Sequence, residues 1–109
     1  MAAPRKRKCR ECGEVFEARK SDAHFCSASC RKTFNNRRMT RGALLYDLFM
    51  AMRYDREPAK KNGVNWNTLC RLGELYHYED QRDGRGRTHR PAFEVMQEHS
   101  TEINARRVG

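Results

Sequence analysis

The stretch HFCSASCRKTFNNRR, residues 24 to 38, places two cysteines directly before a run rich in Arg, Lys and Asn. Ser27 is a typical helix N-cap, so a helix is predicted to begin at Ala28 with Cys30 at its third position. A thiolate at that position is favoured by the positive end of the helix and by its free backbone N–H groups. This stretch therefore predicts a helix whose first turn favours the thiolate form of Cys30, the form that binds metal.

Two earlier cysteines complete a pattern of two close pairs, Cys9-x2-Cys12-x13-Cys26-x3-Cys30. This spacing lets four sulfur atoms converge tetrahedrally, the geometry that Zn²⁺ prefers. A finger of about 30 residues buries too little apolar surface to fold alone, and bound metal would supply the missing stability. We therefore predict one structural Zn²⁺ held by Cys9, Cys12, Cys26 and Cys30.

The alternatives for this pattern are clustered free thiols, a disulfide pair and a redox Cys-x-x-Cys motif, although the last lacks its usual βαβ context. Four cysteine ligands leave no open coordination position, which argues against a catalytic metal. Short strands at Glu14–Phe16 and His24–Phe25 would form a hairpin that returns the second cysteine pair to the first. Gly13 permits the positive φ that a tight metal-binding turn often needs.

The segments CRECGEVF and FCSASCRKTF resemble the FCS-type treble-clef zinc fingers over residues 9 to about 34. In that group, a Cys-x2-Cys-Gly turn is followed by Phe/Tyr-Cys-Ser-x-x-Cys at the start of a helix. The cysteine spacing is similar to that of the small bacterial zinc proteins that inhibit DNA gyrase. The resemblance implies a treble-clef finger, and it admits a role in docking onto an enzyme of DNA metabolism or transcription.

Positive charge is concentrated at the start of the chain, whose formal net charge is +9 overall. Residues 1 to 41 carry +8 of it and residues 42 to 109 only +1. Such a distribution is typical of a protein that binds a polyanion, and Arg and Asn suit both phosphate and base edges. The predicted nucleic-acid contacts are Arg5, Lys6, Arg7, Lys8, Arg10, Arg31, Lys32, Asn35, Arg37, Arg38 and Arg41.

The sequence predicts a non-enzymatic nucleic-acid-binding protein, with a regulatory role and with DNA favoured over RNA. The alternative is a protein-docking module that modulates an enzyme of DNA metabolism or transcription. No Asp-His pair precedes the Asn67–Cys70 segment, so the acid–base groups of a His-metal endonuclease are missing and no catalytic residue is predicted. The segment MAAPRKRKCR lacks the apolar core of a signal peptide, and no apolar run could span a membrane. We therefore expect a cytoplasmic location.

The expected fold is mainly α, with a small zinc-bound β-hairpin in a treble-clef-like finger followed by two or three packed helices. The expected divisions are a flexible basic arm (1–8), the finger with its basic helix (9–41) and a helical extension (42–109).

The first helix should continue to about Arg56, with Gly42 as a candidate break, and residues 57 to 63 should form a loop. A helix from Trp66 to about Glu79 would follow, capped by Asn65, and would pair with the first helix in antiparallel fashion. Cys70 would be a small core residue on its apolar stripe. The last helix would have Pro91 in its first turn.

Overall fold

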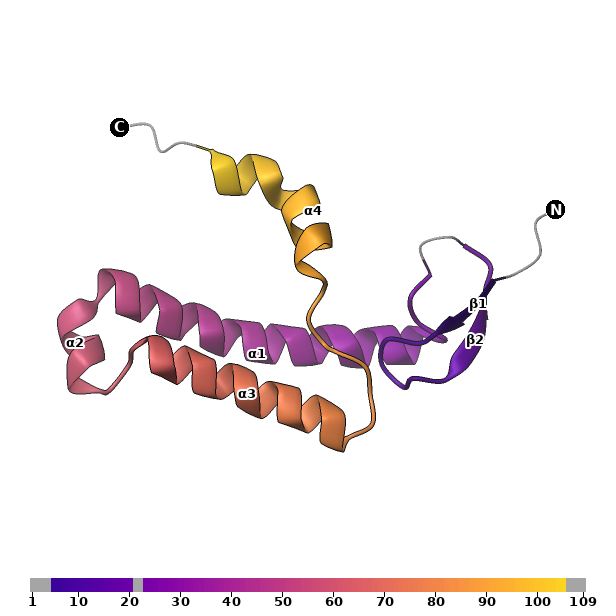
Figure 1. Cartoon of the computed structure of the whole chain (residues 1–109), viewed down its shortest axis with the longest axis horizontal. Helices are drawn as coiled ribbons and strands as arrows, with labels where there is room; N and C mark the ends of the chain where they lie inside the picture. The colour runs from indigo at the N-terminus through magenta and orange to yellow at the C-terminus, as the bar shows by residue number, and fades with distance from the viewer. Residues whose placement is uncertain (1–4, 21–22, 106–109) are drawn as a thin grey trace.

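The computed structural model describes residues 5–20 and 23–105 of the chain. Within these residues it contains two short strands, β1 (Arg5–Lys8) and β2 (Val15–Ala18), followed by four helices (Figure 1). The helices are α1 (Ala28–Tyr54), α2 (Arg56–Lys61), α3 (Trp66–Arg82) and α4 (Ala92–Asn104). The predicted mainly α fold with a small N-terminal hairpin is confirmed. Among the described residues, no helix is both long enough and apolar enough to cross a membrane.

The hairpin pairs β1 with β2, and the predicted pairing of residues 14–16 with residues 24–25 is wrong. Arg5 lies opposite Ala18 and Lys8 lies opposite Val15 in an antiparallel register. Side chains alternate across a strand, and here Arg7, Phe16 and Ala18 on one face of the hairpin are buried or half-buried, while Lys6 and Lys8 on the other face are exposed. Segment 23–25 contributes a backbone hydrogen bond instead, from the Arg10 N–H to the carbonyl oxygen of residue 24, at 2.9 Å.

The expectation of a flexible basic arm over residues 1–8 is wrong for Arg5–Lys8, because these residues form β1. The Arg7 guanidinium also donates to the carbonyl oxygen of Ala23 at 3.4 Å, which links β1 to the segment before Cys26. Residues 1–4 of that predicted arm lie outside the described residues. The basic segment before Cys9 is thus an ordered strand rather than a tether.

Helix α1 begins as predicted. The Ser27 side chain accepts a hydrogen bond from the backbone N–H of Cys30 at 3.1 Å, which places Cys30 at the third helical position. The helix ends at Tyr54 and continues through Gly42 without a break. The division expected between residues 41 and 42 therefore falls inside one helix, which the finger and the rest of the chain share.

The predicted loop over residues 57–63 is wrong in its first part, where α2 forms. Pro58 lies in the first turn of α2, where its missing N–H would have no intrahelical partner in any case. The turn that follows closes at Gly63, whose φ is 71°. This short helix reverses the chain, so that α3 runs back along α1 (Figure 1).

Helix α3 is capped as predicted by Asn65, whose side chain accepts from the backbone N–H of Asn67 at 2.9 Å. The Thr68 hydroxyl accepts from the Asn65 N–H in return, at 3.1 Å. The prediction that Cys70 is a core residue is wrong, because Cys70 is exposed. Pro91 immediately precedes α4 and serves as its N-cap residue.

Few apolar side chains are buried in the part of the chain that the structure describes: Cys9, Ala18, Phe34 and Ala59. Phe34 packs against Phe25 with ring centroids 5.1 Å apart, and it receives the guanidinium groups of Arg37 and Arg38 over its ring. The pairing of α1 with α3 is further supported by Arg41, which lies 4.6 Å from the centroid of the Tyr76 ring. Cation–π contacts of this kind contribute up to about 2 kcal/mol where they are desolvated.

A buried carboxylate, Asp80 on α3, joins the parts of the molecule. It accepts hydrogen bonds from Arg41 at 3.1 Å, from Arg85 at 2.9 Å and from the Thr88 backbone N–H at 3.1 Å. Arg37 donates to the Thr88 hydroxyl at 3.0 Å and, through its other guanidinium nitrogens, to the Glu11 carboxylate. We call this set, Asp80, Thr88, Glu11, Arg37, Arg41 and Arg85, the Asp80 network. It connects α1, α3, the segment after α3 and the turn after Cys9.

Ionisation of Asp80 follows from these contacts. Burial opposes the charged carboxylate, but the hydrogen bonds from Arg85 and Thr88 and the charge of Arg41 outweigh it and hold the pKa of Asp80 below its ordinary value of 3.8. A carboxyl group with a lowered folded-state pKa stabilises the fold above its unfolded pKa. That contribution is lost as the pH falls through the folded-state pKa.

Replacing Asp80 with Asn should lower the free energy of unfolding by about 3 kcal/mol, because the half-buried guanidinium groups of Arg41 and Arg85 lose the charge of a buried carboxylate partner. Urea denaturation at pH 7 measures this loss. The matched control is Asp47→Asn on the exposed face of α1, which should change stability by no more than about 0.5 kcal/mol. Equal stabilities for the two variants would show that the network does not hold the fold together.

The stability difference between the wild-type protein and Asp80→Asn should also depend on pH. It should be constant from pH 7 down to about pH 4 and shrink below the unfolded pKa of 3.8, as Asp80 in the wild type takes up a proton. Urea denaturation of both proteins across this range measures the difference. A difference that grows on acidification would contradict the assigned direction of the pKa shift.

Candidate metal centre

The four cysteines come from two separate turns of the backbone. Cys9 follows β1 and Cys12 lies in the turn before β2, where Gly13 adopts a φ of 75° and donates to the Cys9 carbonyl oxygen at 3.0 Å. Cys26 immediately precedes the N-cap of α1, and Cys30 lies in its first turn. The hairpin and the start of α1 therefore present one cysteine pair each.

The sulfur atoms of Cys9, Cys12, Cys26 and Cys30 all lie within 4.8 Å of one another. The Sγ atom of Cys26 is 3.7 Å from that of Cys12 and 3.6 Å from that of Cys30. Cys9 is buried, Cys30 is half-buried, and the other two are exposed. Four sulfur donors that converge in this way form a candidate metal centre with no position left for a further protein ligand.

The environment of the cluster shifts the pKa values of Cys9, Cys12 and Cys26. Burial of Cys9 opposes its ionisation, but hydrogen bonds from the backbone N–H groups of Cys12 and Cys26 outweigh this effect and lower its pKa to about 6. Hydrogen bonds with the Cys30 and Cys12 thiols raise the pKa of Cys26 to about 12. Several negative charges cannot gather here without compensation, which is what a divalent cation would provide.

The segment after α3 supports the first cysteine turn from outside. A Cβ atom placed on Gly13 would lie 3.6 Å from the carbonyl oxygen of Gly84, and one on Gly86 would lie 3.6 Å from the carbonyl oxygen of Arg10. Glu11, between the two cysteines of this turn, is bound by Arg37 of α1. The cysteine turn is thus held by the Asp80 network as well as by its own hairpin.

The eleven residues predicted to contact nucleic acid divide into two sets. Arg7, Arg10, Arg37, Arg38 and Arg41 have partners within the chain. For example, Arg38 donates to the Thr88 carbonyl oxygen at 2.9 Å, and Arg10 lies 3.6 Å from the Glu94 carboxylate. The side chains of the others are exposed and have no hydrogen bond or ion pair with any described residue: Arg5, Lys6, Lys8, Arg31, Lys32 and Asn35. We call this second set the free basic set.

The sequence analysis missed two further basic residues, Arg19 and Lys20, that extend the basic surface. It also missed the acidic and polar groups that bind several of the predicted arginines. Arg19 and Lys20 follow β2, are exposed and lie next to Ala18, the residue opposite Arg5. Their charge was visible in the sequence, but their position depended on the pairing of β1 with β2. Asp80 gave no signal, because a single acidic residue in a charged helix does not indicate burial.

Comparison of the chain with protein-family models, with curated proteins and with solved structures finds no match. The support for a zinc-finger-like site comes from the geometry of the four-cysteine cluster itself. The particular finger type rests on the cysteine motifs alone.

The cluster should bind one divalent metal ion per chain, and Cys26→Ser should weaken the affinity by more than about 100-fold. Even changes around the ligands commonly weaken it 10- to 100-fold, and this variant removes a ligand. Metal analysis after dialysis against a graded chelator measures the affinity. Cys70→Ser is the matched control, because Cys70 lies outside the cluster, and it should bind metal like the wild type. Metal loss in both variants, or in neither, would contradict the assignment.

Proposed function

We propose that the chain is a zinc protein in which Cys9, Cys12, Cys26 and Cys30 hold one structural Zn²⁺. A Zn–S distance of about 2.3 Å in a tetrahedron places the sulfur atoms about 3.8 Å apart. The separations of Cys26 from Cys30 and from Cys12, 3.6 and 3.7 Å, are close to this value before any ion is added. The all-sulfur donor set also favours Zn²⁺ over the harder cations Mg²⁺ and Ca²⁺.

The arrangement around the cluster supports a finger of the treble-clef type. A hairpin turn supplies one cysteine pair, and the second pair lies at the start of a long helix. The Cys-x2-Cys-Gly and Phe-Cys-Ser-x-x-Cys motifs of the FCS type occupy these two elements. The role of the ion in this proposal is structural, since four thiolates would leave no coordination position for a substrate.

The function that we propose for the finger is non-enzymatic binding of nucleic acid, with a regulatory role. The observation that carries it is the free basic set: its cations are exposed and unpaired at the metal-binding end, although Asp80, Glu11 and Glu79 neutralise other arginines nearby. Lys6 and Lys8 project from the outer face of β1, and Arg31 and Lys32 lie one turn after Ser27 on α1. An ordered strand and helix lose little freedom on binding phosphate, which favours this use of their charges.

Duplex DNA is the target we favour. The major groove of B-DNA admits an α-helix, whereas the deep and narrow major groove of duplex RNA does not. Arg31 and Asn35 are one helical turn apart on α1, and both side chain types can make paired hydrogen bonds to base edges. The cations of the hairpin would then contact the phosphate backbone beside the groove.

Binding of duplex DNA should depend steeply on salt. Replacing both Lys6 and Lys8 with Ala should reduce the slope of log affinity against log salt by about 2, because each lost phosphate contact removes about 0.9. Fluorescence anisotropy with duplex DNA, single-stranded DNA and duplex RNA measures this. The matched control is Arg56→Ala combined with Lys61→Ala. It removes the same charge from exposed positions on α2, far from the cysteine cluster, and should leave the slope nearly unchanged.

If the two double variants reduced the salt slope equally, DNA binding would depend on the net charge of the protein and not on the position of its cations. A slope near zero for the wild type would contradict nucleic-acid binding and favour the second candidate function, docking onto an enzyme of DNA metabolism or transcription. That candidate is supported by large apolar side chains exposed on α1 and α3, among them Phe49, Trp66 and Leu75.

A further inference from the structure

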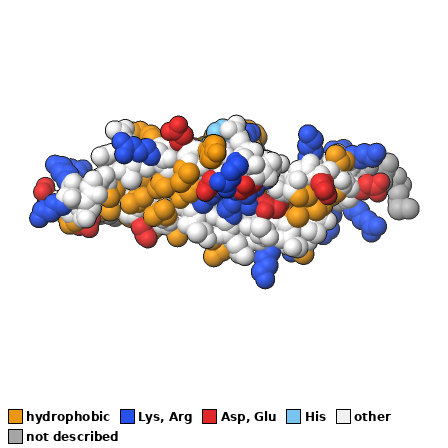
Figure 2. All heavy atoms as spheres, turned by 90° about the horizontal axis from the view of Figure 1, so that it is seen from below, with side chains coloured by type: hydrophobic (Ala, Val, Ile, Leu, Met, Phe, Trp, Pro, Cys, Tyr) orange, Lys and Arg blue, Asp and Glu red, His pale blue; other side chains and the backbone are white. Residues whose placement is uncertain are grey.

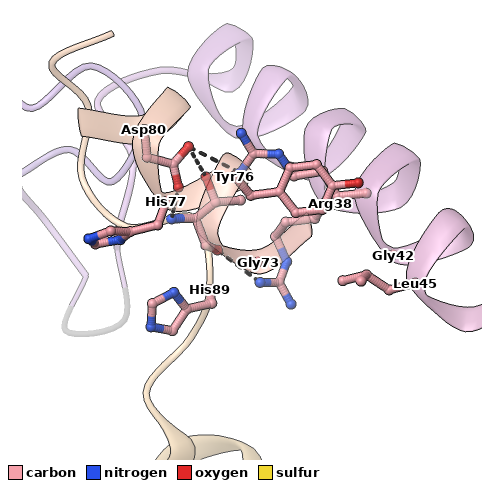
Figure 3. A pocket seen from close by; sticks show the side chains of 10 residues that line it. Arg38, Gly42, Leu45, Gly73, Tyr76, His77, Asp80 and His89 are labelled. Atoms are coloured by element: carbon pink, nitrogen blue, oxygen red, sulfur yellow. Dashed lines mark hydrogen bonds and ion pairs between the residues drawn. The ribbon is translucent and has the colours of Figure 1, made fainter. Parts of the chain in front are cut away.

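A cavity of about 360 Å³ lies between α1 and α3 (Figure 3). Helix α1 contributes Gly42 and Leu45 to its lining, and α3 contributes Gly73 and Tyr76. This volume is within the range of about 300–1,000 Å³ that is typical of small-molecule sites, which often lie between helices. At the surface, by contrast, charged groups separate the exposed apolar side chains into patches on the face shown in Figure 2. The cavity is therefore a place where apolar and polar groups surround one space of ligand size.

Two glycines keep this cavity open. Gly42 and Gly73 lie inside α1 and α3, and a Cβ atom added to either would meet nothing within 4 Å. Neither glycine is thus required for close packing within the chain, although glycine is less favourable than alanine in the interior of a helix. A larger side chain at either position would occupy the cavity. The two glycines are explained if a ligand uses the space beside them.

The polar groups of the cavity favour an anion. Arg38 uses one of its guanidinium N–H groups to donate to the Thr88 carbonyl oxygen, at 2.9 Å. The remaining N–H groups can bind a carboxylate in the paired geometry that guanidinium groups favour. His77 and His89 also line the cavity and are exposed. Neither has a hydrogen bond or ion pair with any described residue, so a ring N–H of each is available to donate as well.

The other charged groups of the cavity, Arg41 and Asp80, compensate each other. The buried Asp80 carboxylate accepts a hydrogen bond from Arg41 at 3.1 Å and another from Arg85 at 2.9 Å. An anion in the cavity therefore does not meet an unpaired carboxylate. Arg41 also lies 4.6 Å from the centroid of the Tyr76 ring, which holds this ring in place as an aromatic wall. Aromatic rings pair with such a wall by offset stacking or edge-to-face contact.

We propose that this cavity binds a small planar aromatic carboxylate. The ring of the ligand packs against Tyr76 and Leu45, and Arg38 binds its carboxylate. The net charge of +9 favours an anionic ligand over a neutral or cationic one. The proposal does not rest on the proposed nucleic-acid binding.

NMR titration of the full-length, zinc-loaded protein with β-naphthoate tests the proposal. The amide signals of Gly42 and Gly73 should shift on binding, with a dissociation constant of about 1 mM or lower, as expected for a ligand of this size. Two analogues are the matched controls. β-Naphthamide has the same rings without the charge, and the saturated decalin carboxylate has the charge without a planar ring. Each should bind at least about 5-fold more weakly than β-naphthoate.

Gly42→Leu should weaken β-naphthoate binding by at least about 10-fold, because the new side chain occupies the cavity. Leucine is also a better helix former than glycine, so the variant should keep its helicity, which circular dichroism checks. The matched control is Ala43→Leu. Ala43 is the next residue on α1, is exposed and does not line the cavity, so this variant should bind like the wild type. Gly73→Leu repeats the test from α3.

Arg38→Gln separates charge from shape. Glutamine keeps an N–H donor for the Thr88 carbonyl oxygen but removes the positive charge, so this variant should lose the preference for β-naphthoate over β-naphthamide. Unchanged binding in both glycine variants, or an equal loss in Ala43→Leu, would overturn the proposal. So would decalin carboxylate binding as tight as that of β-naphthoate, which would indicate a general attraction of anions to a basic chain. The absence of any binding by the wild type up to about 5 mM would overturn it as well.

Discussion

The buried carboxylate of Asp80 is the interaction on which the arrangement of this molecule depends. It lies on α3, binds Arg41 of α1, and binds Arg85 and Thr88 in the segment that leads to α4. Through Thr88 and Arg37 it also reaches Glu11, between the first two cysteines. In a chain that buries so few large apolar side chains, one charged group holds together elements that a hydrophobic core joins in larger domains.

This network changes the meaning of the basic residues around the finger. A run such as RKTFNNRR suggests one continuous cationic surface, but its last two arginines turn inward to Thr88 and Glu11. Buried ion pairs are weak sources of net stability compared with well-packed apolar groups, yet they are strongly destabilising when one partner is removed. The network therefore selects one arrangement of the helices, and it leaves a smaller and better-defined set of cations for an external anion.

The features that could be predicted from the sequence were those that depend on local chemistry. Ser27 and Asn65 are N-caps because their side chains satisfy backbone groups a few residues away. The cysteine pairs were recognisable because metal ligation restricts their spacing. The length of α1 also followed from its own periodicity, to within two residues at its C-terminal end.

The features that were missed depend on contacts between distant segments. The hairpin partner of Val15–Ala18 was a basic segment with no strand signal, and its pairing is decided by the fold around Cys9. Cys70 matched an apolar stripe, but no described element of the chain packs over Cys70 itself, so its side chain is exposed. Asp80 and the arginines bound to it are ordinary helical charges in the sequence, and only the tertiary arrangement makes them a network.

The continuity of α1 has a mechanical consequence. Cys30 of the four-cysteine cluster lies in its first turn, Cys26 directly precedes its N-cap, and its 27 residues extend for about 40 Å to α2. A rigid rod pivoting by about 5° at one end moves its other end by about 3.5 Å over that length. Small adjustments where the sulfur atoms meet would thus be amplified at the opposite tip of the molecule, with α1 acting as a lever arm.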